Sequence, residues 1–208
     1  VIQLQPPITI AFLTYASDLK KQVRNAKKVG HEIIVHMAME SERENVDPGP
    51  NVLLTKNDSK KILNELRWGL NRFNGYVGIN NHMGSRFTSD PKGMGIVMRE
   101  LKRRGLLFLD SRTSRNTVGA SVALAYDVPY AQRDFFLDND ASLKAVKKQL
   151  QKVESFAKKN GYAVAIGHPK DATLKALSEW LKTLKGRGFA QVPISQLVKY
   201  QTSSFSNN

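Results

Sequence analysis

The segment Glu32-Ile-Ile-Val-His36 is a short apolar run that ends abruptly in a histidine, and two later segments share this design. They are Val77-Gly-Ile-Asn-Asn-His82 and Ala163-Val-Ala-Ile-Gly-His168, and a helical pattern follows each of the three. In α/β folds, ligands bind at the C-terminal ends of the strands, where each strand leads into the next element. Histidine is also the commonest metal ligand and a frequent general acid or base. The three segments therefore predict one shared site.

Strand and helix patterns alternate along the chain. Apolar runs predict strands over 9–13, 33–36, 77–81, 106–110, 130–133, 162–166 and 189–192. Amphipathic spacing and capping residues predict helices over 17–29, 58–73, 91–104, 116–125, 141–160 and 172–184. Near-continuous apolar strands separated by helices indicate a parallel sheet with helices outside it. We therefore expect a single-domain (β/α) barrel of about seven or eight mostly parallel strands.

The domain is expected to cover residues 1–201, and the polar residues 202–208 are expected to form a flexible tail. The chain starts at Val1, in the middle of a pattern, so we expect a first strand to lie upstream of it. No apolar run approaches the roughly 18 residues that a membrane span needs. A transmembrane segment is therefore not predicted in this stretch of sequence.

Composition excludes several kinds of site. The chain has no cysteine, which rules out a thiolate metal site and a cysteine nucleophile. The net charge of +14 favours anionic partners, although lysines that solvate helix faces would account for it equally. Nucleic acid is not an expected partner, because the sequence shows no basic stripe with interleaved aromatics and no helix-turn-helix or zinc-finger spacing.

Polar residues gather after three of the predicted strands. His36 and Glu40 are four apart, a spacing that brings two ligands together on one helical turn or in a tight loop. Asn80-Asn81-His82-Met83-Gly84-Ser85-Arg86 is a dense polar cluster that is costly to bury without a purpose. We expect Asn80, Asn81 and Arg86 to bind substrate, with a structural loop network as the alternative.

Two further polar pairs are candidates for the site. Asp110 and Arg112 follow the predicted strand 106–110, where they either serve the site or form a plain salt bridge. We expect Arg112, like Arg86, to bind substrate. Arg133 and Asp134 either hold a catalytic imidazole in its orientation or form a surface pair. His168 ends a buried strand and is the best candidate for a catalytic acid.

Several phrases resemble a known family. Gly30-His-Glu-Ile followed by His36 is similar to the second motif of polysaccharide deacetylases of the NodB-homology type. Ile166-Gly-His168 resembles the last motif of that family, whose histidine is a general acid. The sequences of residues 80–87, 108–113 and 133–138 look closest to the divergent polysaccharide deacetylase family of bacteria. This resemblance covers about residues 7–197.

The resemblance implies a metal-dependent hydrolase that removes acetyl groups from an N-acetylated polysaccharide or cell-wall glycan. It implies a divalent metal, expected to be zinc, held by His36, His82 and an upstream aspartate. A second upstream aspartate would be the base, and His168 would protonate the leaving amine. Asp110, or Arg133 with Asp134, would orient His168.

The chain departs from the family pattern at the metal site. Glu40 stands where the second metal-binding histidine is usual, and it would be a fourth ligand or rim the pocket. The usual arginine-proline-tyrosine phrase is replaced by Asn80-Asn81-His82-Met83. The alternatives are a catalytically degenerate glycan-binding or scaffold module, and a binder of anionic polymers. The resemblance also implies an extracytoplasmic location.

Overall fold

The computed structural model describes residues 1–205 and has an α/β architecture. Five strands form a parallel sheet in the order β1-β2-β3-β4-β5, and β6 pairs with β7, also in parallel. The strands are β1 (Thr9–Leu13), β2 (Glu32–Met39), β3 (Gly78–Met83), β4 (Leu107–Asp110), β5 (Tyr130–Gln132), β6 (Phe135–Phe136) and β7 (Ala165–Ile166). The predicted parallel sheet is thus confirmed.

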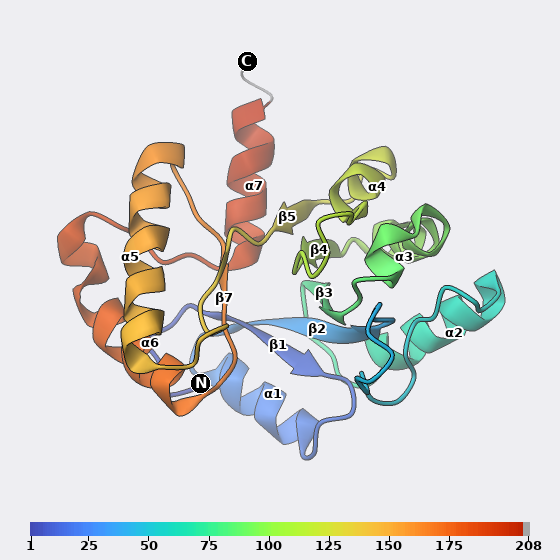
Figure 1. Ribbon diagram of the computed structural model, residues 1–208, viewed down its shortest axis with the longest axis horizontal. Helices are drawn as coiled ribbons and strands as arrows, with labels where there is room; N and C mark the ends of the chain where they lie inside the picture. Colours follow the sequence, from blue (N-terminus) through green and yellow to red (C-terminus); the bar gives the residue numbers. More distant parts are fainter. Residues whose placement is uncertain (206–208) are drawn as a thin grey trace.

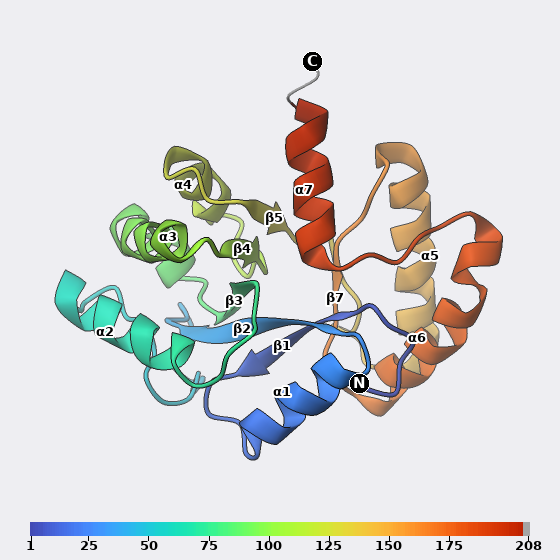
Figure 2. The same ribbon diagram turned by 180° about the vertical axis from the view of Figure 1, so that it is seen from behind.

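Most of the helices lie on the outside of the strands (Figures 1 and 2). They are α1 (Leu19–Lys28), α2 (Ser59–Leu70), α3 (Pro91–Arg104), α4 (Gly119–Ala125), α5 (Leu143–Asn160), α6 (Asp171–Leu184) and α7 (Ile194–Phe205), with short 3-10 turns at Phe87–Ser89 and Lys185–Arg187. In Figure 1, α2, α3 and α4 stack on one side of the molecule, and α5 and α6 lie on the opposite flank beside β7. None of the helices in residues 1–205 is both long and apolar enough to cross a membrane.

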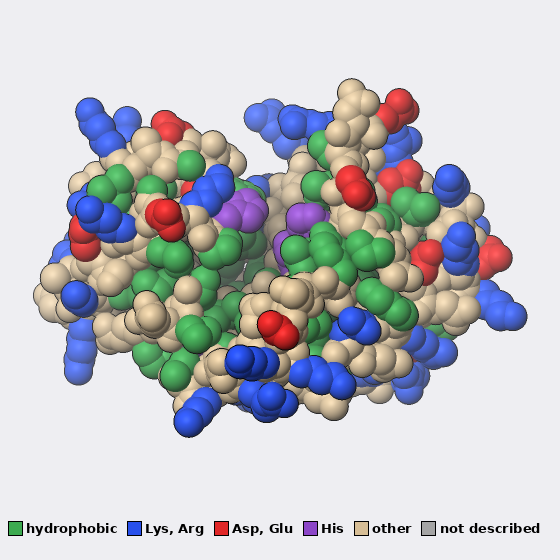
Figure 3. Space-filling view, turned by 90° about the horizontal axis from the view of Figure 1, so that it is seen from below, with side chains coloured by type: hydrophobic (Ala, Val, Ile, Leu, Met, Phe, Trp, Pro, Cys, Tyr) green, Lys and Arg blue, Asp and Glu red, His purple; other side chains and the backbone are tan. Residues whose placement is uncertain are grey.

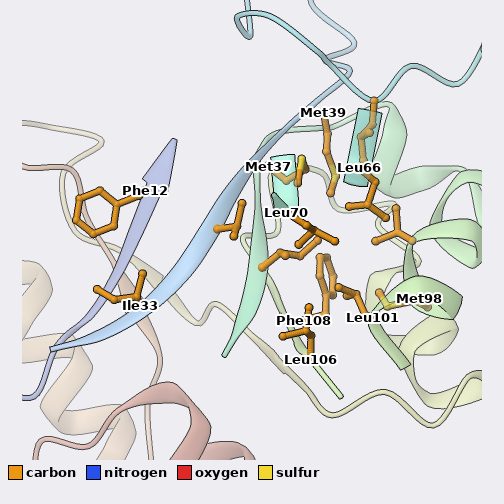
Figure 4. Packing of buried hydrophobic residues seen from close by; sticks show 14 of the residues in the cluster. Phe12, Ile33, Met37, Met39, Leu66, Leu70, Met98, Leu101, Leu106 and Phe108 are labelled. Carbon is orange, nitrogen blue, oxygen red and sulfur yellow. The ribbon is translucent and has the colours of Figure 1, made fainter. Parts of the chain in front are cut away.

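The two faces of the sheet bury different sets of side chains, because successive residues of a strand point to opposite faces. On the outer face, Met37 and Phe108 lie among residues of α2 and α3 such as Leu66 and Met98, whereas Ile33 of the same cluster lies beside Phe12 (Figure 4). On the inner face, a separate cluster joins the sheet to α7. Its buried members are Ile34, Leu107, Leu109, Ala131, Val164, Ile194, Leu197 and Val198.

The expected closed barrel is not shown in residues 1–205. The hydrogen-bonded ladder is interrupted between β5 and β6. There the chain changes partner, because Arg133 N–H donates to the Asp110 carbonyl (2.9 Å) and Asp134 N–H donates to the Val164 carbonyl (2.8 Å). β1 and β7 are not paired with each other either.

One prediction at the C-terminal end was wrong, and one helix there was not predicted. Residues 189–192 form no strand, because the Gln191 side chain, rather than a backbone ladder, donates to the carbonyls of Gln5 and Pro7. Helix α7 was not predicted, and it includes residues 202–205 of the expected flexible tail. The rest of that tail, residues 206–208, lies outside the described residues.

Candidate functional site

Strands β2 and β3 place two of the predicted histidines side by side. Their register pairs His36 with Asn80 and Ala38 with His82. All four residues therefore share the inner face of the sheet, and His82 lies diagonally across from His36. The two imidazole rings meet edge to face, with their centroids 4.8 Å apart. The sheet itself thus brings His36 and His82 together, as the sequence predicted.

Asn80 orients the His36 ring. Its side-chain oxygen lies 2.8 Å from His36 Nδ1, so this nitrogen carries the proton and donates. The lone pair of His36 is then on Nε2, which lies 3.1 Å from His82 Nδ1. Asn80 is itself held by a bond from its amide nitrogen to the Ser111 hydroxyl (3.2 Å).

The surroundings keep both rings neutral. Burial, followed by the charge repulsion of His82, lowers the pKa of His36 to about 3, although the Asn80 hydrogen bond opposes this shift. Burial and the nearby His168 lower the pKa of His82 as well. Neutral imidazole is the form that binds metals. The pair is therefore suited to share a cation near neutral pH.

His168 follows β7 and is held by Asp138, a carboxylate that the sequence analysis did not assign to the site. Asp138 Oδ1 lies 3.1 Å from His168 Nδ1, and Oδ2 accepts from the His168 backbone N–H (2.7 Å) and the Thr173 hydroxyl (3.1 Å). The Asp138 side chain is fully buried, whereas half of the His168 side chain is exposed. His168 thus presents an oriented ring to solvent.

A signal for Asp138 does exist in the sequence. The register of β6 and β7 pairs Phe136 with Ile166. Asp138 and His168 each follow these residues by two positions, so they leave the two strands at the same level. Asp138 is an acidic residue just after a strand, and the pairing of that strand with β7 would have identified it as the partner of His168.

The expected orienting residues, Asp110 and Asp134, bond to other groups, whereas Asp138 lies against His168. Asp110 accepts from Arg112 N–H (2.7 Å) and the Thr117 hydroxyl (2.7 Å), because its loop turns back on itself. Asp134 accepts from Val164 N–H (2.8 Å).

Arg133 reaches His168 only through an aromatic ring. Its guanidinium donates to the carbonyls of Ser111 (2.6 Å) and Arg112 (2.8 Å). It also lies over the Phe136 ring at 5.0 Å, and that ring is 5.3 Å from the His168 ring. Phe136 therefore separates the arginine from the imidazole.

Glu40 does not lie with the histidines as a ligand. Strand β2 continues to Met39, so four residues of extended chain, about 13 Å, separate Glu40 from His36. Its carboxylate accepts from the backbone and hydroxyl of Thr55 (2.6 and 2.7 Å) and lies 3.6 Å from Arg86 Nε. Within residues 1–205, no three His, Asp or Glu side chains group closely enough to hold a metal ion.

The four expected substrate-binding residues divide into two kinds. Asn80 and Asn81 are buried, and the Asn81 amide binds Ser111 N–H (2.8 Å) and the Met83 carbonyl (2.8 Å), so both asparagines support the site from within. This matches the structural alternative. Arg86 and Arg112 are exposed and remain available to a ligand.

The histidines border a concave part of the surface. Figure 3 shows histidine side chains on both sides of a hollow in the face that it views. The remaining histidine, His31, is buried and accepts from Ile8 N–H (3.2 Å), so it is structural.

Fold and site together define a parallel α/β protein with a histidine site on the inner face of its sheet. The family model of the divergent polysaccharide deacetylases matches residues 1–198, and the chain belongs to this family. The family expected from the sequence is thus confirmed.

Two bacterial proteins are similar to the chain over most of its length. The chain is similar to the uncharacterized protein YibQ of Escherichia coli (strain K12), with 33% identity over 88% of this chain and 57% of YibQ. An uncharacterized protein of Haemophilus influenzae is 31% identical over 85% of this chain and 63% of that protein. The chain therefore spans about three fifths of the length of these relatives.

A solved structure shares the fold. The crystal structure of the uncharacterized protein ATU2773 from Agrobacterium tumefaciens C58 matches with a TM-score of 0.92 and 29% identity. The match covers 94% of this chain and 80% of that one.

Proposed function

We propose that the protein is a metal-dependent hydrolase that removes acetyl groups from an N-acetylated polysaccharide or cell-wall glycan, with zinc as the metal. The observation that carries the proposal is the 3.1 Å separation of His36 Nε2 and His82 Nδ1. Two nitrogens bound to one tetrahedral zinc at 2.0–2.1 Å would lie about 3.3 Å apart. These two side chains thus fit two zinc ligands.

The chain's own residues would divide the work. His36 and His82 bind the metal, and Asn80 keeps the lone pair of His36 on Nε2. When bound, zinc would polarise the acetyl carbonyl and lower the pKa of its water. An upstream aspartate as third ligand, and another as base, stay predictions of the family resemblance.

His168 would supply the proton for the leaving amine. Asp138 accepts from Nδ1, which leaves Nε2 as the nitrogen that would donate to the substrate. Exposed Arg86 and Arg112 would contact the glycan outside the reacting bond. An extracytoplasmic location, where such glycans occur, completes the proposal.

The test is acetate release from N-acetylglucosamine oligomers and peptidoglycan fragments by the zinc-loaded, full-length protein. The His168→Ala variant should bind zinc normally and lose at least about 100-fold in kcat. A control, Leu124→Ala, changes an exposed side chain and should match the wild type. Unchanged turnover in His168→Ala would remove the general acid from the proposal.

A second function has one observation in its favour. Glu40, at the position of the family's second metal-binding histidine, is bonded to Thr55, as a degenerate, glycan-binding member of the family would show. Glycan binding by the zinc-treated protein without acetate release from any of these substrates would favour this second function.

A further inference from the structure

We infer that a groove along α5, outside the histidine site, binds an acidic polysaccharide through stacked sugar rings and lysine side chains. The groove has a volume of about 530 Å³, and its lining includes Phe135, Phe156, Lys148, Lys152 and Lys159. The inference deepens the proposed function by naming the class of glycan, and it rests on that proposal for the choice of a sugar polymer.

The floor of the groove is aromatic. Phe135 of β6 and Phe156 of α5 pack edge to face, with ring centroids 5.3 Å apart and an interplanar angle of 81°. Both side chains are partly exposed. The face of an aromatic ring is electronegative and attracts the weakly positive C–H groups of a sugar ring. An apolar patch rimmed by polar side chains is typical of a ligand groove.

The rim of the groove is cationic and lacks partners of opposite charge. Helix α5 contains six lysines and a single acid, Glu154. Among the residues described, no ion pair involves Lys148, Lys152 or Lys159. Glu154 does not neutralise them, because its carboxylate is bound by Arg187 (3.0 Å) and by the Trp180 indole. The uncompensated positive charge favours an anionic ligand.

The geometry suits a chain-like ligand. Lys148 and Lys159 are eleven residues apart on α5, which separates them by about 16 Å along the helix axis. Lys152 and Phe156 lie between them on the same side, because residues three and four apart share a face. An oligosaccharide laid along this face would meet an aromatic ring and three lysines in succession.

The position of the groove sets it apart from the histidine site. Phe135 and Phe136 are consecutive in β6, so their side chains point to opposite faces. Phe136 lies against His168, whereas Phe135 lies against α5. Changes in the groove should therefore alter glycan binding without disturbing the metal site.

The test measures binding of galacturonic acid hexamer, neutral chitohexaose and polyphosphate to the full-length protein by calorimetry at moderate salt. The wild type should prefer the galacturonate oligomer. Lys148→Gln/Lys152→Gln should weaken its binding about tenfold. Phe156→Leu should also weaken it several-fold while leaving polyphosphate binding unchanged. Thermal unfolding of each variant checks that the fold is intact.

A matched control distinguishes the groove from general charge. Lys20→Gln/Lys21→Gln removes the same charge from the hollow beside α1 and should leave binding unchanged. Equal losses in the two double variants, no effect of Phe156→Leu, or equal affinity for chitohexaose would overturn the inference. Zinc content and acetate release of the wild type are recorded in parallel. If the wild type binds the galacturonate oligomer through the groove but neither binds zinc nor releases acetate, the proposed function is contradicted and the inference about the groove is not.

Discussion

Asn80 decides which nitrogen of His36 is free. Its side-chain oxygen is 2.8 Å from Nδ1, and this contact directs the lone pair of Nε2 toward His82. Partners of this kind fix the tautomer and the orientation of a metal-binding histidine. Asn80 was expected to bind substrate, yet it is buried beside His36 and orients the His36 ring.

We expect Asn80→Ala to lower zinc affinity by about 10–100-fold, because His36 would lose its fixed tautomer. Competition with a chromogenic chelator would measure the change. Ser111→Ala is the control, since it removes the acceptor of the Asn80 amide but keeps the contact with His36. Equal losses in both variants would show that the packing of the loop, and not the tautomer, controls affinity.

Asp138 orients the His168 ring as Asn80 orients that of His36. We expect Asp138→Asn to reduce kcat about 100-fold or more while zinc content stays constant. The asparagine oxygen would keep the bonds to His168 N–H and Thr173, so its NH2 group would face Nδ1 and favour the tautomer that leaves Nε2 without a proton. Nitrogen NMR of the imidazole would show a changed tautomer in the same variant. A lower kcat with an unchanged tautomer would assign the effect to another cause.

At the scale of elements, α2 and α3 are joined by one buried carboxylate. Glu100 of α3 is 3% exposed and binds Arg67 of α2 (3.1 Å), Arg103 (2.7 Å) and Arg104 (2.8 Å). Hydrogen bonds from Arg103, together with those from Arg67 and Arg104, hold the pKa of Glu100 well below its usual range against the opposing effect of burial. The ionised form therefore stabilises the fold.

We expect Glu100→Gln to cost about 2 kcal/mol in the free energy of unfolding at pH 7. Because the folded-state pKa is lowered, this contribution is complete above the unfolded value of about 4.3 and is lost as the pH falls toward the folded value. Urea unfolding at pH 7 and pH 3 should show the difference shrinking. Glu179→Gln, in an exposed pair with Lys147, should show little change at either pH. A pH-independent cost would contradict the ionic explanation.

Elements with a clear pattern or clear end signals were predictable, whereas β6 and α7 were missed. Helix α3 runs from Pro91 to Arg104 as expected, because a proline and a glycine mark its ends. Strand β6 has only two residues, too few to show alternation. Helix α7 has its buried residues Ile194, Leu197 and Val198 at helical spacing, but the polar residues after them resembled a tail.

At the scale of the whole molecule, the pairing of the strands was the feature that the sequence did not predict. Apolar runs indicate that a strand forms, but they do not determine which edges pair. The change of partner between Arg133 and Asp134 is a tertiary effect, and it separates β5 from β6. The three histidines each end an apolar run, so the sequence indicated one shared site. Asp138 could be identified only once the pairing of β6 with β7 was known.

The central claim is that His36 and His82 together hold a metal ion. Zinc content and zinc titration of the full-length protein test it most directly, with His36→Ala, His82→Ala and His168→Ala compared with the wild type. We predict about one zinc per chain in the wild type and in His168→Ala, and its loss in the other two variants. A wild type that binds no zinc, or a His82→Ala variant with unchanged zinc content, would contradict the claim.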